Sequence, residues 1–158
     1  MTTVQLGRKC KLYISINGNF GGPSWLEVAN VSDLTRSIAW DTTDANSRES
    51  AAKMIVKTLV DLSISGKLKF ANGDANTNSI MDALMSPDAF LDVLCLSGPL
   101  ATAGNYGVRF QAQVTEGNED QGLGTALYED IKFMPTPLGG NAPQSAKVVG
   151  SAPVFTSI

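Results

Sequence analysis

Few residues of this chain are suited to catalysis or to metal binding. Histidine is absent, which removes the commonest general base and the commonest transition-metal ligand. Cys10 and Cys95 each lie on an apolar strand face, so we expect two buried thiols rather than a disulfide or a pair of metal ligands. The sequence therefore predicts a protein that is not an enzyme and that needs no metal or cofactor.

Two short segments carry the residue types of ligand-binding loops without the required spacing. The glycine-rich stretch 17–23 precedes no Lys-Ser/Thr pair and opens no helix, which argues against a phosphate cradle. Glu116, Glu119 and Asp120 lack the alternating oxygen ligands and the closing glutamate of a calcium loop. No spacing or raised pKa marks them as a glycosidase pair. We interpret them as a solvated acidic turn.

Composition restricts the class of protein further. With 158 residues, 43% of them hydrophobic, the chain can form one domain with a substantial core. A net charge of −3 argues against a protein that binds nucleic acid through its phosphates, although DNA could still slide past such a surface. The sequence has no apolar run of about 18 residues and no secretory signal pattern. We therefore expect no membrane span and a soluble, cytoplasmic product.

The main structural element is a long strand over residues 58–70. From Val60 to Phe70, apolar and polar residues alternate, which predicts one buried and one wet face. At about 3.3 Å per residue the strand would span about 40 Å, which is long for a small domain. Gly66 on the apolar face is the expected position of a bulge. A strand of this length suits a sheet that continues across subunits into a closed barrel.

The remaining pattern is also mainly β. One amphipathic helix is predicted over 76–86, capped by Ser79 with Asp82 or by one of Asn76 to Asn78, and ended by Pro87. Residues 90–96 are apolar on both faces, which indicates a central strand. Alternation or strand-forming residues predict the other strands at 10–16, 25–31, 34–40, 108–114 and 125–134.

Two segments have the character of contact regions. The stretch 41–54 is too long for a tight turn and lacks core residues, so we expect an interaction loop. Its candidate contact residues are Asp41, Asp44, Arg48, Glu49, Lys53 and Met54. After a domain over 1–137, residues 138–158 are expected to form an extended arm that docks on a neighbour. Its apolar contacts would come from Val148, Val149, Val154 and Phe155.

The order and spacing of these features resemble the major tail proteins, or tail tube proteins, of long-tailed bacteriophages. The resemblance covers most of the chain up to about Pro137. The matching pieces are the opening Leu6–Tyr13, the segment Trp25–Leu34, Arg48 in the polar loop, the strand Leu59–Ile64, the helix around Ile80–Ala83 and the stretch Ala103–Arg109.

The resemblance implies a β-sandwich or half-barrel subunit with one short flanking helix, whose sheet continues across subunits. It implies rings of six subunits stacked into a hollow tube through which DNA passes, with the 41–54 loop between rings. Expected partners are further copies of the chain and the tape measure, terminator and baseplate or tip proteins. Expected locations are the virion tail and, during assembly, the host bacterial cytoplasm.

A wall that lets DNA pass should be neutral or acidic, because each lysine or arginine contact to a phosphate adds salt-sensitive affinity. Asp61, Ser63 and Ser65 are the candidate lumen residues, and Lys67 and Lys69 are expected outside the channel or paired with acids such as Glu129 and Asp130. The alternative hypothesis is a monomeric carbohydrate-binding β-sandwich with Trp25, Trp40 or Tyr106 as a sugar platform.

Overall fold

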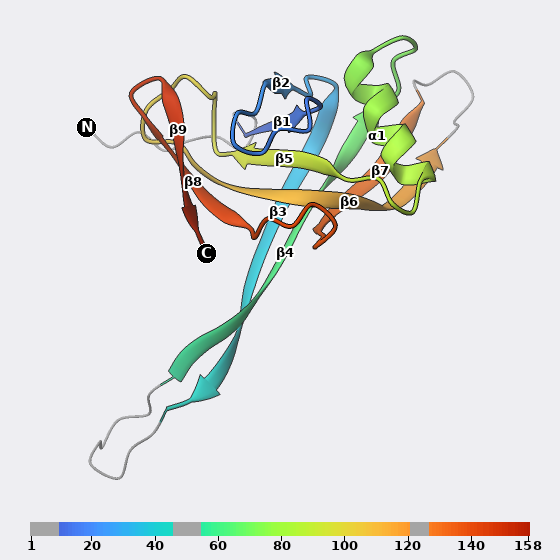
Figure 1. Ribbon diagram of the computed structural model, residues 1–158. Helices are drawn as coiled ribbons and strands as arrows, with labels where there is room; N and C mark the ends of the chain where they lie inside the picture. Colours follow the sequence, from blue (N-terminus) through green and yellow to red (C-terminus); the bar gives the residue numbers. More distant parts are fainter. Residues whose placement is uncertain (1–9, 46–54, 121–126) are drawn as a thin grey trace.

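The structure, a computed structural model, describes residues 10–45, 55–120 and 127–158 (Figure 1). These residues form one helix, α1 (Ala75–Met85), and nine strands. The strands are β1 (Lys11–Ser15), β2 (Trp25–Glu27), β3 (Val31–Asp44), β4 (Ile55–Lys69), β5 (Leu91–Leu96), β6 (Tyr106–Asp120), β7 (Tyr128–Pro135), β8 (Gln144–Val149) and β9 (Ala152–Ser157). The prediction of a mainly β fold with one short flanking helix is confirmed.

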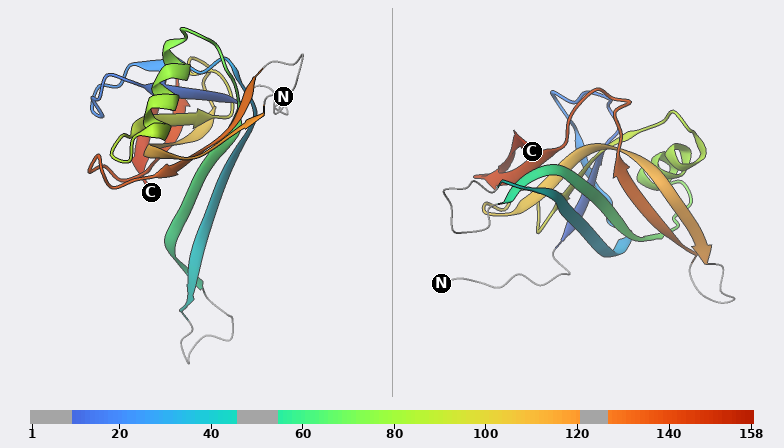
Figure 2. Two further views of the ribbon diagram at one scale, coloured as in Figure 1. Left: turned by 90° about the vertical axis from the view of Figure 1, so that its right-hand side faces the viewer. Right: turned by 90° about the horizontal axis from the view of Figure 1, so that it is seen from below.

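The strands form a curled antiparallel sheet, in the order β2-β1-β5-β6-β7-β4-β3. The long strand β6 joins its two halves, because residues near its start pair with β5 and residues near its end pair with β7. The hairpin of β8 and β9 lies off this path and pairs with the start of β6. The result is a half-barrel with a second layer over one side (Figures 1 and 2).

Two hydrophobic clusters occupy the two faces of this sheet. The larger lies inside the half-barrel and includes Leu62, Ile64, Phe110 and Phe133, all almost fully buried. The smaller lies under the β8–β9 hairpin and includes Tyr13, Leu94, Leu96, Ala146 and Val148. The strand β5 contributes to both clusters, and all six of its residues are buried. The prediction of a central strand covered on both faces is therefore confirmed.

The helix α1 covers the open end of the larger cluster, with Ile80 and Ala83 buried against it. Its N-cap is Asp74, whose carboxylate accepts a hydrogen bond from the backbone N–H of Thr77 at 2.8 Å. The sequence prediction of a cap at Ser79 or at residues 76–78 was therefore wrong, because these residues are already helical. Within the described residues no helix is long and apolar enough to cross a membrane.

The predicted alternation along β4 is confirmed, but the predicted bulge lies in the partner strand. Ser32 of β3 faces Lys67, and Thr35 faces Ser65, so Asp33 and Leu34 together face the single residue Gly66. Asp33 is in the left-handed region, with φ of 50°. Gly66 leaves room for this bulge, because a Cβ there would lie 2.9 Å from Val31 Cγ2.

The C-terminal segment differs from the predicted extended arm. Residues 144–149 and 152–157 form the β8–β9 hairpin, and residues 144–147 pair with Tyr106–Arg109 of the same chain. Val148 is buried in the smaller cluster, and Phe155 packs at its edge. The apolar residues of this segment thus serve first to cover the subunit's own sheet. Val149 and Val154 point outwards and are more than half exposed.

Candidate interaction surfaces

The hairpin of β3 and β4 projects far beyond the body of the molecule (Figures 1 and 2). The predicted loop boundary at Asp41 was wrong, because residues 41–44 continue β3 and pair with residues 55–57 of β4. Asp41 and Asp44 are therefore strand residues near the distal end of the hairpin. Arg48, Glu49, Lys53 and Met54 lie outside the described residues.

Both faces of the distal hairpin carry exposed apolar side chains. On the face that continues the core side, Ile38 lies opposite Leu62, and Trp40 lies opposite Val60. On the other face Leu59 is 70% exposed. Exposure of such side chains to water is unfavourable, and burying each of them in a protein contact would contribute about 1.5–3 kcal/mol of stabilisation. Exposed apolar residues on both faces indicate that the hairpin inserts between other protein surfaces.

Among the open strand edges in the described part of the chain, two belong to the long strands β3 and β6. The strand β3 is the last in the order, so its outer edge is open along residues 31–44. Ala112 of β6 pairs with β5 on one edge and with β7 on the other. Beyond Ala112, β5 has ended, so the edge of β6 over residues 113–120 is open as well. Open edges present unpaired backbone groups and favour pairing with another chain.

The face of this sheet that points away from the core is polar. Asp61 is exposed, and Ser63 and Ser65 are half-buried on the same face. Lys67 lies directly opposite Asp130 in the register of β4 and β7. Lys132 Nζ lies 3.5 Å from Glu116 Oε1. Lys67 and Lys132 on this face thus stand beside an acid, whereas Lys69 lies opposite Tyr128.

Glu116, Glu119 and Asp120 were wrongly predicted to form an acidic turn, because all three belong to β6. Glu119 lies opposite Glu129 of β7 on the core side of the sheet. Glu129 is 5% exposed, and burial together with the nearby charge of Glu119 raises the pKa of its carboxyl. Two carboxylates on neighbouring strands repel each other when both are ionised.

Gly117, two residues before Glu119 on β6 and opposite Ile131, leaves the space that the Glu129 side chain occupies. A Cβ at Gly117 would clash with Glu129 Oε1 and with Leu84 Cδ2 of α1. We expect Gly117→Ala to lower the free energy of unfolding by about 1–3 kcal/mol, as for other overpacked sites. Urea denaturation would measure this loss. Gly21→Ala is the matched control, because its φ is not positive and an added Cβ would meet only Asn19 Oδ1 at 3.6 Å, an ordinary van der Waals contact. A stability of Gly117→Ala equal to wild type would contradict this account.

Arg109 alternates with apolar residues along β6, a pattern typical of a strand with one exposed face, yet it is 3% exposed. Its Nη2 donates to Asp92 Oδ2 and to the backbone oxygen of Phe20, each at 2.6 Å. The guanidinium also lies over aromatic rings, at 3.7 Å from the centroid of Phe20 and 4.6 Å from that of Phe155. Because Phe155 is in β9, Arg109 ties the C-terminal hairpin to the central sheet.

The Asp92 carboxylate is costly to bury even with this partner. Desolvation raises the pKa of Asp92, and the hydrogen bond and charge of Arg109 only partly oppose this effect. One signal in the sequence marked the pair, since Asp92 interrupts an otherwise apolar strand. No signal identified Arg109 as its partner, because the two residues meet only through the pairing of β5 and β6.

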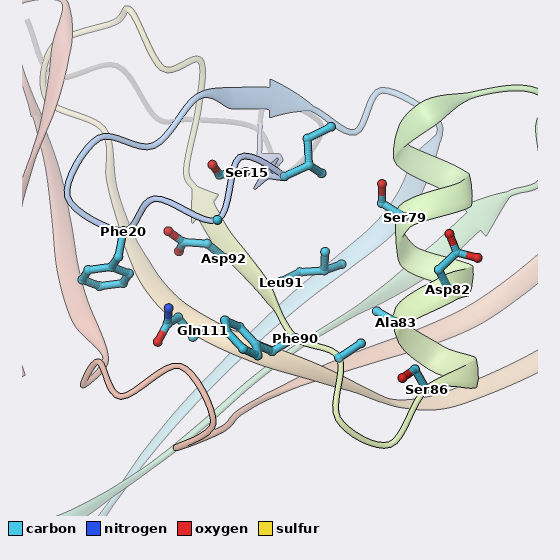
Figure 3. Close-up of a pocket in the computed structure, with 13 residues that line it drawn as sticks. Ser15, Phe20, Ser79, Asp82, Ala83, Ser86, Phe90, Leu91, Asp92 and Gln111 are labelled. Carbon is cyan, nitrogen blue, oxygen red and sulfur yellow. The ribbon is translucent and has the colours of Figure 1, made fainter.

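A pocket of about 440 Å³ lies between α1, β5 and the loop that follows β1 (Figure 3). Its polar lining includes Ser79 and Asp82 of the helix, with Asp92 and Gln111 from the sheet. Asp92 is bound to Arg109, and Gln111 Oε1 accepts a hydrogen bond from the backbone N–H of Asn141 at 3.2 Å. These groups serve the fold, and they do not form a nucleophile and base arrangement.

Other chemistry expected from the sequence is equally limited. Cys10 and Cys95 are free thiols, and burial raises the pKa of Cys95 to about 11, so it is a poor nucleophile. In the described ranges no three acidic or cysteine side chains could hold a metal. Trp25 packs on Phe155 with ring centroids 6.2 Å apart, and Lys57 lies over Trp40. The aromatic residues proposed as a sugar platform are thus engaged on separate elements.

Solved structures with the same fold are tail tubes and related assemblies. The tail of an empty gene transfer agent particle, solved with C6 symmetry, matches with a TM-score of 0.63 and 16% identity over 98% of this chain and 100% of that chain. The SPP1 tail tube matches with a TM-score of 0.62 and 12% identity over 98% of this chain and 81% of that chain.

The six-fold symmetrised baseplate of the anti-feeding prophage matches with a TM-score of 0.56 and 13% identity, over 86% of this chain and 94% of that chain. No protein-family model and no curated protein matches the chain by sequence. At these identities the comparisons show the fold. The chain therefore has the fold of tail tube proteins.

Proposed function

We propose that this chain is a structural subunit of a phage-type tail tube, without catalytic activity. The observation that carries the proposal is the β3–β4 hairpin, which extends apolar side chains on both faces beyond the subunit's own core. A monomer has no use for such a surface, whereas a self-assembling subunit does. The fold shared with a helical tail of C6 symmetry supports rings of six copies.

Within a ring, the open edge of β3 pairs with the open edge of β6 in the next copy. The strands β6, β7, β4 and β3 alternate in direction, so β3 runs opposite to β6. Rotation about a ring axis preserves strand direction, so this junction is antiparallel. Repetition closes the sheet into a barrel and removes every open edge of these four strands.

Between rings, the contact is made by the projecting hairpin and by the segment 41–54 at its end. Leu59 and Ile55 are buried by the next ring, and Arg48, Glu49, Lys53 and Met54 belong to the same contact region. The exposed Val149 and Val154 of the β8–β9 hairpin provide a second apolar contact with a neighbour. Both surfaces lie outside the covered core of the subunit.

The polar face of the sheet lines the channel, with Asp61, Ser63 and Ser65 on the wall. Lys67 and Lys132 stand beside Asp130 and Glu116, so neither presents an isolated positive charge to phosphate. DNA therefore passes without being held, because few counterions are released by contact with such a wall. A band of Asp61 carboxylates, repeated around the ring, adds negative potential.

The tube subunit works with other tail proteins, namely a tape measure, a terminator, and baseplate or tip proteins. Its place is the tail of the virion, after assembly in the cytoplasm of the host bacterium. This proposal is supported by the kinds of particle that share the fold, which are gene transfer agent and phage tails and a prophage baseplate.

The proposal predicts that the purified chain polymerises. Concentration at neutral pH should yield rings and long tubes in negative-stain micrographs, with a central channel and six-fold averages. A reconstruction should place Asp61 and Ser63 towards the channel. Two results would contradict the proposal. One is a polymer in which the hydrophobic face of the sheet points towards the channel. The other is a chain that stays monomeric at about 1 mM, a concentration at which contacts worth about 4 kcal/mol already produce association.

A further inference from the structure

Glu129 is an acidic residue that is only 5% exposed. Within the described residues no cationic side chain is paired with it, and the charge that acts on its carboxyl is that of another acid, Glu119. The Glu129 carboxylate does not remain over β7, because Oε1 lies above Gly117 of the neighbouring strand. The Glu129 side chain thus extends over β6, whose edge over residues 113–120 is open. A buried charge of this kind is costly unless it is paired.

Arg36 lies at the other open edge of the same sheet. It is the only cationic residue of β3, and it shares the core side with Ile64, which it directly faces. Its Nη1 makes two long hydrogen bonds, to the backbone oxygens of Cys95 at 3.4 Å and of Tyr106 at 3.3 Å. The side chain remains exposed, so its other guanidinium N–H groups are available.

In a closed barrel, the offset between neighbouring copies places Arg36 of one copy and Glu129 of the next at similar positions along the barrel axis. One row of paired residues runs from Glu129 through Leu68 to Val31 of β3. In a barrel, the strands are tilted by about 35–45° to the axis and lie about 4.8 Å apart. From one copy to the next, which is four strands away, equivalent residues are therefore displaced along the strand direction by about 13–19 Å, or about four to six residues. Arg36 faces Ile64, which is four residues from Leu68 along β4.

The direction of the shift also agrees. In Figure 1, β3 and β4 rise towards the upper right, β7 lies to their right, and β6 runs across them and ends to their right. Sheets twist with one hand, so strands in a barrel lean the same way around the axis. With a barrel axis along the vertical of Figure 1, an equivalent copy on the free side of β3 would meet it lower than Val31, on the side of the hairpin where Arg36 lies.

We propose that Arg36 of one copy pairs with Glu129 of the next copy in the ring. This pairing rests on the proposed function, and it identifies the charge contact that completes each junction. Next to it, the exposed Ile38 and half-buried Trp40 pack against Met85 of the neighbour's α1, which is 76% exposed. The Leu84 side chain beside Gly117 belongs to the same contact.

The pairing accounts for two features of the isolated subunit. Glu129 has no cationic partner within the described residues because that partner belongs to another chain, and Gly117 leaves space for its carboxylate to lie over β6. Lys57 is the nearest other cation on the core side of the hairpin, but it lies over Trp40 at 5.2 Å from the ring centroid. Arg36 is therefore the residue that has the opposite charge to Glu129 and a similar position along the barrel axis.

The test compares four neutralised variants of the full chain. Arg36→Gln and Glu129→Gln remove the proposed pair, while Lys67→Gln and Asp130→Asn remove charges of the same signs from the polar face, away from the β3 and β6 edges. Sedimentation and negative-stain microscopy give the critical concentration for ring and tube formation. We expect Arg36→Gln and Glu129→Gln to raise it at least about tenfold and the two controls to change it less than about twofold.

Thermal unfolding of the unassembled subunit separates this effect from misfolding. Glu129→Gln removes a buried unpaired charge, so its melting temperature should equal or exceed that of wild type while assembly fails. Assembly of Arg36→Gln and Glu129→Gln at wild-type concentrations would overturn the pairing and leave the proposed function intact. A wild-type chain that forms no rings would overturn both.

Discussion

Arg109→Ala should lower the free energy of unfolding by about 3–5 kcal/mol, because it leaves Asp92 buried without its charge partner. The Asp92 carboxylate receives hydrogen bonds from Nε and Nη2 of Arg109. Alanine also removes the guanidinium from between the rings of Phe20 and Phe155. The loss should release the β8–β9 hairpin from the sheet, and denaturation in urea at pH 7 would measure it.

The pH dependence distinguishes a lost charge pair from a lost side chain. Burial already raises the pKa of Asp92, and removal of Arg109 should raise that pKa further. An acid whose pKa is raised in the folded state destabilises the protein above that pKa. The deficit of the variant should therefore shrink as pH falls towards about 3.9, the value of an unperturbed aspartate.

The exposed pair of Lys132 and Glu116 provides the matched control, since its atoms are 3.5 Å apart in solvent. Lys132→Ala should cost no more than about 1 kcal/mol. If Arg109→Ala loses as little as this control, or if its deficit is constant with pH, the buried pair does not hold the hairpin.

Removal of the distal hairpin should abolish assembly without unfolding the subunit. Trp40 and Val60 face each other across β3 and β4, so residues 41–59 can be replaced by an Asn-Gly turn that joins them. The main core, which includes Leu62 and Ile64, is left intact. The deletion removes Leu59 and Ile55, whose burial between rings is worth about 1.5–3 kcal/mol each.

Losses of this size at every contact raise the critical concentration more than about a hundredfold, since each 1.4 kcal/mol is a factor of ten. Circular dichroism and thermal unfolding should match those of unassembled wild type, while micrographs show no tubes. Leu138→Ser, which removes an exposed apolar side chain from the loop after β7, should assemble normally. Normal long tubes from the shortened chain would show that the hairpin is not the contact between rings.

Much of the fold could be predicted from local sequence pattern. Alternation from Val60 to Phe70 determines a strand with two unlike faces, and the spacing of Ile80 and Leu84 determines the helix. The apolar run 91–96 determines a strand covered on both faces. The absence of histidine excluded many kinds of active site. These features depend on neighbouring residues, whose periodicity is set by backbone geometry.

The interaction surfaces were only partly predictable. The polar face with Asp61 and Ser63 followed from alternation, but the length of the hairpin was underestimated because residues 41–44 are small and polar yet pair with β4. The sequence pattern of small, polar residues is the same in a loop and in a strand that has no contact with the core. Only the partner strand, which supplies the hydrogen bonds, separates the two.

Tertiary structure alone decided which side chains became buried charges. Alternation placed Arg109 opposite the core face, and it could not show that β8 and β9, more than thirty residues later in the chain, would cover that face. Likewise, Glu129 met Gly117 only through the register of β6 and β7. Sequence period fixes which residues share a face, whereas long-range strand pairing determines what lies against that face, because partners distant in the chain meet only after folding.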